Sequence, residues 1–436
     1  SSVFRVMPQG PCAGGQVSAC GRLVETERPV VCWGVMHRWS LGLPLLVALG
    51  CGEPSGETID SATAASSGET TAAPTGGSTE AATTSGATAA TTGGMGGSAS
   101  TDATTGAVDP TTSGTGPDTT GGPDKPVRCG DPPPDGAELA PEIPAYGGSC
   151  PTIETGYMDG QAFNVLPQTV DGQTFERKFL VIVPEDLQDD ETLPVVFLWH
   201  WLGGDAQDFY DRGDVQNAAN QKRFIAVIPE ARDGVLFKWP FSILDPQSSL
   251  DAEFQFFDDM LSCVHEQFNV DKECVSSTGV SAGALFTSQL AGGRGERLAS
   301  FMSLSGGTGG LTVKPWTTPE HKMPAMVLWG GEGDFCIAVD FAATSKDLEK
   351  NLTAGGHFVV ECIHNCNHST PPFPVPEGMT TFAPLWDFFL DHPYWLGPGE
   401  SPYNDHGLPA SMPDWCAVGV GNAVPPAEPC DKNECM

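Results

Sequence analysis

Hydrophobic positions between residues 177 and 390 follow two patterns that alternate along the chain. Short apolar runs such as 193–201 ("LPVVFLWHW") and 224–231 ("FIAVIPEA") predict strands buried on both faces. In 251–268 the apolar residues recur three and four positions apart, which predicts an amphipathic helix. Repeated strand–helix units of this kind predict an α/β fold in which helices cover both faces of a mainly parallel sheet.

The same patterns place the individual elements. The Pro-, Gly- and Cys-rich segments 126–170 and 395–436 are expected to wrap the core as disulfide-stapled extensions. We expect strands at 177–185, 193–201, 224–231, 274–280, 298–307, 323–334 and 357–369, and helices at 213–223, 251–268, 282–291, 344–356 and 381–392.

Composition separates this globular part from a long polar segment. Residues 51–125 are almost entirely Thr, Ala, Gly, Ser and Pro with scattered acids. Such a segment buries too little apolar surface to offset the entropy lost on ordering, so we expect a disordered linker. Residues 126–436 hold nearly all the remaining Trp, Phe, Ile and Leu outside the N-terminus, which is enough for one large domain.

The N-terminal stretch has the order of an export signal. Residues 36–50 run from Met, His and Arg through a short apolar stretch to small residues before Cys51. The ending "ALGC" resembles a bacterial lipobox, which would place a lipid on Cys51. The apolar run is too short to span a bilayer comfortably, so we favour a signal peptide over a transmembrane anchor. Residues 1–35, which do not start with Met, are expected to be non-native upstream translation.

The net charge of the chain narrows the range of possible binding partners. The chain carries 55 acidic and 21 basic residues, for a formal net charge of -34. A polyanion would be repelled and no basic stripe is visible, so we expect no nucleic-acid partner. Membrane contact is expected only through a lipid at Cys51, on a secreted or cell-surface protein of a bacterial envelope.

The cysteines favour an oxidising compartment. Four of the 14 lie at or before Cys51, and ten remain in the globular part. An even set in an exported domain predicts disulfides. The sequence does not fix their pairing, although Cys362 with Cys366 and Cys430 with Cys435 are close enough to be candidates.

One stretch also has an alternative interpretation as a metal site. "CIHNCNH" offers Cys362, His364, Cys366 and His368, but its alternating spacing lacks the paired C-x-x-C ligands of zinc sites. We therefore expect neither a metal nor a cofactor.

The stretch "TGVSAGA" is the first indication of a catalytic residue. Gly279 and Gly283 flank Ser281 at the G-x-S-x-G spacing, between a predicted strand and a predicted helix. Small neighbours are needed where a serine sits on a strained strand-to-helix turn. A serine hydroxyl is a weak nucleophile by itself, so this interpretation requires a base, an orienting acid and an oxyanion hole.

Partners for the serine follow other predicted strands. Asp334, His368 and the "HWLGG" loop at 200–204 each lie at the C-terminal end of a strand, where functional residues of parallel sheets gather. His364 and His357 compete with His368. Glu332 and Asp340 compete with Asp334, although Asp340 is expected on the next helix.

The order Ser…Asp…His and four longer stretches carry a resemblance to α/β-hydrolases, within the secreted esterases grouped with polyhydroxybutyrate depolymerases, feruloyl esterases and acetyl xylan esterases. The likeness covers roughly residues 170–390. The stretches are "PVVFLWHWLGGDAQDF", "FDDMLSCVHEQFNVDKECVSSTGVSAGAL", "PAMVLWGGEGDFCIAVD" and "CIHNCNHSTPP".

The resemblance implies a role for each candidate. Ser281 would be the nucleophile, His368 the general base and Asp334 the acid that orients it. The N–H groups of Ala282 and Leu202 would form the oxyanion hole. Residues 126–436 would thus be an α/β-hydrolase catalytic domain.

Two tryptophans are expected at the substrate. The family's glycine after the loop histidine is Trp201 here, which would reshape the acyl pocket or offer a stacking face. Trp239 and Phe241 are expected to line the cleft, with packing in a surface loop as the alternative.

These features favour a secreted serine esterase that acts through an acyl-enzyme on ester-bearing polymers or their fragments, of the polyhydroxyalkanoate, feruloyl or acetyl-polysaccharide type. One alternative is a peptidase or acyltransferase on the same fold. The other is an inactive surface lipoprotein that binds a polymer.

Overall fold

The computed structural model describes residues 126–157, 163–232, 234–235, 237–430, 432 and 434–435. The expected upstream translation at 1–35, the signal peptide at 36–50, the lipid site at Cys51 and the linker at 51–125 all lie outside the described residues.

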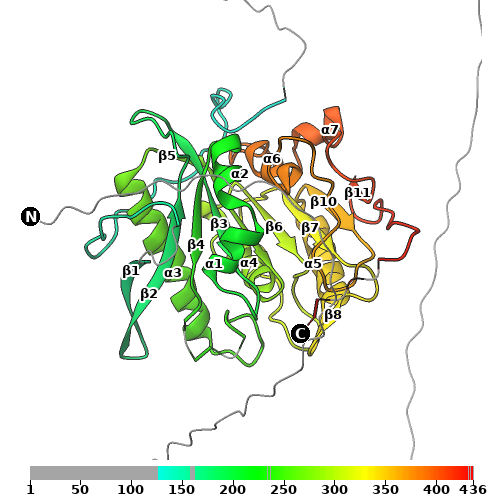
Figure 1. Cartoon of the computed structure of the whole chain (residues 1–436), viewed down its shortest axis with the longest axis horizontal. Helices are drawn as coiled ribbons and strands as arrows, with labels where there is room; N and C mark the ends of the chain where they lie inside the picture. Colours follow the sequence, from blue (N-terminus) through cyan, green and yellow to red (C-terminus); the bar gives the residue numbers. More distant parts are fainter. Residues whose placement is uncertain are drawn as a thin grey trace, which may run out of the picture. The chain divides into compact units, whose positions relative to one another are not determined.

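The apolar runs of the sequence pair with one another in a nine-stranded sheet (Figure 1). The strands are β1 (Asn164–Val170), β2 (Gln173–Ile182), β3 (Leu193–Trp199), β4 (Ile225–Pro229), β5 (Val270–Val280), β6 (Ser300–Leu304), β7 (Ala325–Trp329), β10 (Val359–Ile363) and β11 (Cys416–Val418). Their order across the sheet is β1-β2-β4-β3-β5-β6-β7-β10-β11. Neighbours from β4 to β10 are parallel, and the strands at both edges are antiparallel. The predicted, mainly parallel sheet is confirmed.

Helices cover both faces of this sheet, as predicted. The helices are α1 (Ala206–Arg212), α2 (Val215–Lys222), α3 (Gln247–Gln267), α4 (Ala282–Gly293), α5 (Phe341–Gly355), α6 (Ala383–Leu390) and α7 (Pro402–His406), with a short 3-10 helix at Gly295–Arg297. Residues of α3, α4 and α5 share one core with Phe179 and Val181 of β2. Residues of α1, α2 and α6 share the other core with Leu180 and Ile182. Successive β2 side chains thus alternate between the two cores, because a strand has a period of two.

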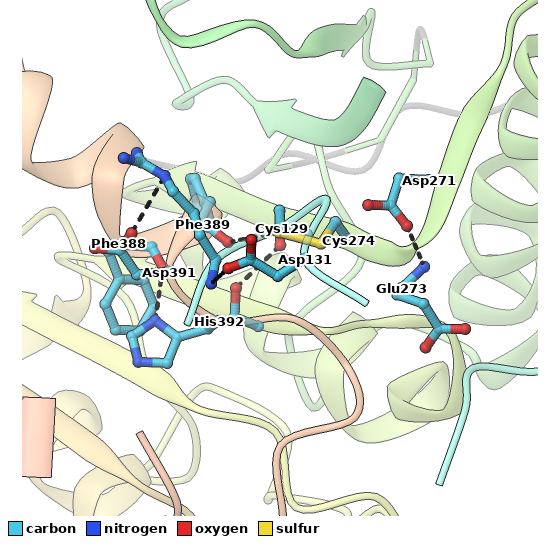
Figure 2. Close-up of a disulfide and its surroundings, with 12 residues drawn as sticks. Cys129, Asp131, Asp271, Glu273, Cys274, Phe388, Phe389, Asp391 and His392 are labelled. Carbon is cyan, nitrogen blue, oxygen red and sulfur yellow. Dashed lines mark hydrogen bonds and ion pairs between the residues drawn. A yellow bond between two sulfur atoms is a disulfide. The ribbon is translucent and has the colours of Figure 1, made fainter. Parts of the chain in front are cut away.

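The 126–170 segment is stapled to the sheet and to α3. Cys129 is bonded to Cys274 at the start of the buried part of β5, and Figure 2 shows this disulfide beside Phe389 of α6. The Cys129 N–H donates to the carbonyl of Leu390, 2.7 Å away. A second disulfide joins Cys150 to Cys263 of α3, and the end of the segment adds β1 to the sheet.

The 395–436 segment is stapled to the opposite edge. Its strand β11 pairs with β10, and Cys362 is bonded to Cys416 across the pair. Cys366 is bonded to Cys430. Cys336 of the small hairpin β8 (Phe335–Cys336) and β9 (Val339–Asp340) is bonded to Cys435.

The ten cysteines form five disulfides, as their even number predicted, but the suggested pairs were wrong. Cys362 does not bond Cys366, and Cys430 does not bond Cys435. Sequence proximity misled here because β11 and the residues after it return to the strand that carries Cys362. Both cysteines of "CIHNCNH" are oxidised, so neither offers the thiolate that the metal interpretation needs.

Within the described part of the chain, no helix combines the length and the apolar character that crossing a bilayer requires.

Candidate active site

Ser281 occupies the corner between β5 and α4. Its backbone lies at φ 55° and ψ -117°, a region that serine rarely adopts and that costs about 1–3 kcal/mol. Flanking glycines make the corner possible, because a Cβ on Gly283 would lie 2.0 Å from the Trp199 carbonyl oxygen. A Cβ on Gly279 would lie 2.3 Å from the backbone of Gly283. The G-x-S-x-G spacing therefore reflects close contact of three backbone segments, as a nucleophile elbow requires.

His368 and Asp334 meet this serine, as the sequence predicted. The Ser281 hydroxyl lies 2.9 Å from Nε2 of His368, and Nδ1 of His368 lies 2.7 Å from Oδ1 of Asp334. Asp334 follows β7 and His368 follows β10, so the sheet brings together residues that are 87 and 34 positions apart. With Nδ1–H donating to the carboxylate, Nε2 is free to accept the serine proton.

Asp334 is held on every side. Its side chain is fully buried, and Oδ2 accepts hydrogen bonds of 2.8 Å from the Ser305 hydroxyl and from the Gly330 N–H. Its carbonyl accepts from the N–H of Phe341, and the Phe341 ring stacks on the His368 imidazole with centroids 4.2 Å apart. These contacts fix both the carboxylate and the plane of the imidazole.

Three residues near the C-terminus, Cys430, Glu434 and Cys435, secure the loops of the acid and the base; we call them the clasp residues. The Glu434 N–H donates to the carbonyl of His368 at 3.2 Å. The Glu434 carboxylate accepts from both the N–H and the hydroxyl of Thr370. The disulfides of Cys430 and Cys435 end at Cys366 and Cys336, each two residues from His368 or Asp334.

The loop after β3 is fixed by a neutral histidine. Burial lowers the pKa of His200 to about 4. Its Nδ1–H donates to the Trp201 carbonyl at 2.9 Å, and its Nε2 accepts from the Ala231 N–H at 3.3 Å. This tautomer orients the peptide that leads into Leu202.

A cleft of about 620 Å³ opens in front of Ser281 and His368. Trp201 and Phe241 line it, as predicted, and so do Leu202 and Ala282, the two residues expected to bind the oxyanion. Its wall is largely apolar, and it brings together the loop after β3, the start of α4, the β8–β9 hairpin and α6.

Trp239 does not line the cleft, which corrects the sequence prediction. Its side chain is fully buried, packs edge-on against Trp199 and stacks with Phe286. Its Nε1–H donates to the His200 carbonyl at 2.8 Å. A buried indole needs an acceptor for its N–H, and here the carbonyl of His200 is that acceptor. Trp239 therefore supports the loop from behind.

The competing candidates have other partners. His357 Nδ1 hydrogen-bonds to the Met323 carbonyl, and buried His364, whose pKa burial lowers to about 4, accepts from the Cys366 N–H. Glu332 pairs with Lys346 at the surface, and the Asp340 side chain caps the first turn of α5.

Several site residues escaped the sequence analysis. Ser305 supports Asp334, and Phe341 supports His368. Arg212 brings a guanidinium group to the cleft and Glu434 brings a carboxylate. Ser305 and Phe341 directly follow strands and Glu434 lies next to a cysteine, signals that many other residues share, and Arg212 has neither signal.

This strand order, with the serine after β5, the aspartate after β7 and the histidine after β10, defines an α/β-hydrolase fold. Comparison with curated proteins shows a likeness to feruloyl esterase D of Neurospora crassa, at 23% identity over 171 residues. The match covers 38% of this chain, which spans only 56% of that relative's length. The predicted resemblance to the feruloyl esterase group is thus confirmed. No family model matches the chain.

Solved structures with similar folds include esterases. Native pOPH shares 17% identity, with a TM-score of 0.48 over 62% of this chain and 97% of that one. Acetyl xylan esterase from Aspergillus awamori shares 19% identity, with a TM-score of 0.34 over 41% of this chain and 74% of that one. A ferulic acid esterase shares 14%, with a TM-score of 0.38 over 48% and 90%.

Proposed function

We propose that the chain is a serine hydrolase of carboxylic esters. The observation that carries this proposal is the continuous hydrogen-bonded row Ser281–His368–Asp334 at the floor of an apolar cleft. A strained serine, a histidine within 2.9 Å and a buried carboxylate behind it are the three parts that nucleophilic acyl transfer needs.

In the proposed reaction the Ser281 oxygen attacks the ester carbonyl carbon while Nε2 of His368 takes the hydroxyl proton. Asp334 holds the imidazole in the required tautomer and stabilises its positive charge. His368 then returns the proton to the alcohol oxygen as the C–O bond breaks. A water molecule, which gives a proton to Nε2 of His368, then attacks the carbonyl carbon of the acyl-enzyme. His368 passes that proton to the Ser281 oxygen as the acyl C–O bond breaks, which releases the acid and restores Ser281.

The oxyanion would be bound by two backbone N–H groups. Ala282 is the first residue of α4, so its N–H has no acceptor within that helix. Leu202 lies in the loop that His200 and Trp239 fix from behind. Loss of one such donor typically costs on the order of 3 kcal/mol of transition-state stabilisation.

The proposed substrates are ester-bearing polymers or their fragments. A largely apolar cleft of about 620 Å³ suits an aromatic or aliphatic acyl group, and the curated relative is named a feruloyl esterase. A flexible linker of the length of 51–125 would span roughly 45–50 Å, a reach that suits an insoluble substrate. Five disulfides fit a secreted or cell-surface site of action, with a lipid at Cys51 as the proposed anchor.

The test compares wild type with Ser281→Ala on feruloyl, acetyl-sugar, hydroxyalkanoate and 4-nitrophenyl esters, together with fluorophosphonate labelling. We expect the alanine variant to lose label and to lose at least about 10³-fold in kcat. Ser248→Ala, on the exposed start of α3, is the matched control and should keep both. A wild type no faster than Ser281→Ala would contradict the proposal and leave the polymer-binding alternative. Amide cleavage or transfer to an added alcohol would identify the peptidase or acyltransferase instead.

A further inference from the structure

One charged side chain of the cleft has no hydrogen bond or ion pair among the described residues. Arg212 ends α1 and, among the residues that the structure describes, is the only lysine or arginine that lines the cleft with Ser281 and His368. Most other arginines of the fold pair with carboxylates, as Arg177 does with Glu253 at 2.7 Å. For Arg212, the described part of the chain offers no hydrogen bond and no ion pair within 4.0 Å.

The exposed Arg212 side chain nevertheless makes an aromatic contact. Its guanidinium lies over the Trp201 ring, 4.9 Å from the centroid, and both side chains line the cleft. Stacking on an aromatic face fixes the flat side of a guanidinium and leaves its N–H edge available. The N–H edge of a guanidinium matches a carboxylate, which it can bind through two parallel hydrogen bonds.

One oxygen of the Glu434 carboxylate, which also lines the cleft, is bound by Thr370. Burial acts to raise the pKa of Glu434, but the hydrogen bonds from Thr370 and the positive charges of Arg212 and Lys432 outweigh burial and lower it. Both hydrogen bonds from Thr370 go to Oε2 of Glu434. Among the described residues no ion pair within 4.0 Å joins Glu434 to Arg212, so the guanidinium donors stay available for another group.

We propose that Arg212 is a specificity-determining residue that binds a free carboxylate on the substrate, remote from the ester that Ser281 attacks. The preferred substrates would then be esters with an anionic group, such as half-esters of dicarboxylic acids or oligoester fragments that end in a carboxylate. The apolar wall would hold the body of such a molecule, while Arg212 would bind its charged end. This inference rests on the proposed ester hydrolase function.

The test uses two matched pairs of esters. On the acyl side, 4-nitrophenyl hydrogen adipate is compared with the neutral ester in which a primary amide replaces its free carboxyl group. On the alcohol side, 4-carboxyphenyl butyrate is compared with 4-carbamoylphenyl butyrate. The quantity measured is the ratio of kcat/KM for the anionic ester to that for its neutral counterpart, at low and high salt. The pair that shows the preference identifies the side of the ester on which the carboxylate is recognised.

Arg212→Met keeps much of the stem and removes the charge, so we expect it to lower the ratio about tenfold. Arg212→Lys should restore part of it, because a lysine keeps the charge without the planar fork. Arg232→Met is the matched control: Arg232 also lies over an aromatic ring, Phe175, at 4.8 Å, but does not line the cleft. A ratio that is equal in Arg212→Met and wild type would overturn the proposal.

A binding measurement keeps this test separate from turnover. Calorimetry with adipic acid monoamide and with neutral adipamide on Ser281→Ala should show tighter binding of the anion, and Arg212→Met in that background should remove the difference. Equal binding of the two ligands would count against Arg212 even if esters are hydrolysed. Absence of ester turnover with a clear preference for the anion would count only against the proposed reaction.

Discussion

At the scale of single residues, the two oxygens of Asp334 have separate tasks. Oδ1 accepts from His368, while Oδ2 accepts from Ser305 and from the Gly330 N–H. A carboxylate with these donors fixed around it can hold the imidazole in only one orientation. An amide in the same place would carry an N–H₂ group on one side and would compete with that arrangement.

We therefore expect Asp334→Asn to fold but to lose about 10³–10⁴-fold in kcat, because an amide that donates to Nδ1 places the imidazole proton on Nε2, where it blocks transfer from Ser281. Asp340→Asn, six positions along, is the control: asparagine caps helices as well as aspartate does, so kcat should not change. Ester kinetics and fluorophosphonate labelling measure both. An active Asp334→Asn would show that the acid is not needed for orientation.

At the scale of elements, the sequence predicted the buried strands, helices α2 to α6 and the three strand ends that meet at Ser281, but not helices α1 and α7. Buried parallel strands are readable because both their faces are apolar, as in the fully buried β3. Strands β1 and β11 went unnoticed inside the segments 126–170 and 395–436, because an edge strand has one partner and a weaker apolar pattern. Disulfide pairs and the position of Trp239 depend on how distant segments return to the core, which no local pattern records.

The clasp residues also belong to a distant segment that returns to the core, and removing one of their disulfides gives a specific prediction. Cys336→Ser/Cys435→Ser should lower kcat by on the order of tenfold or more, since the loops that carry Asp334 and His368 lose a fixed anchor and small displacements of reacting groups are costly. Ester kinetics well below the unfolding temperature measure the effect.

The matched control removes the disulfide on α3, in Cys150→Ser/Cys263→Ser. Loss of either disulfide should cost about 2–5 kcal/mol of stability, but only loss of the one at the active site should lower kcat. Equal kcat values for the two double variants would mean that the Cys336–Cys435 bond stabilises the fold without positioning the site.

At the scale of the whole molecule, one buried carboxyl group connects stability to pH. Burial, together with the nearby Glu361, raises the pKa of Glu349 from 4.5 to about 8, although it accepts a hydrogen bond of 3.0 Å from Trp329 Nε1–H. The folded chain therefore holds a proton that the unfolded chain has already lost. Between pH 4.5 and 8 the folded state binds more protons, so its stability falls as pH rises through this window.

Glu349→Gln keeps the acceptor for Trp329 and cannot ionise, so its unfolding temperature should fall less than that of wild type between pH 5 and pH 8.5. We expect the difference between the two to change by about 5 °C or more, since each pKa unit corresponds to about 1.4 kcal/mol. Thermal unfolding followed by circular dichroism measures it, with exposed Glu320→Gln as the control that should follow wild type. Parallel curves for Glu349→Gln and wild type would show that Glu349 is ionised in the folded chain.

The position of the clasp residues also sets the point in biosynthesis at which the proposed activity could arise. Cys430, Glu434 and Cys435 are translated after Ser281, Asp334 and His368, yet they complete the loops that hold two of those three. A ribosome must therefore read through Cys435, and an oxidant must then act, before the site reaches its final geometry. Nascent chains, and finished chains kept in a reducing compartment, would carry Ser281, Asp334 and His368 and still lack the full proposed activity.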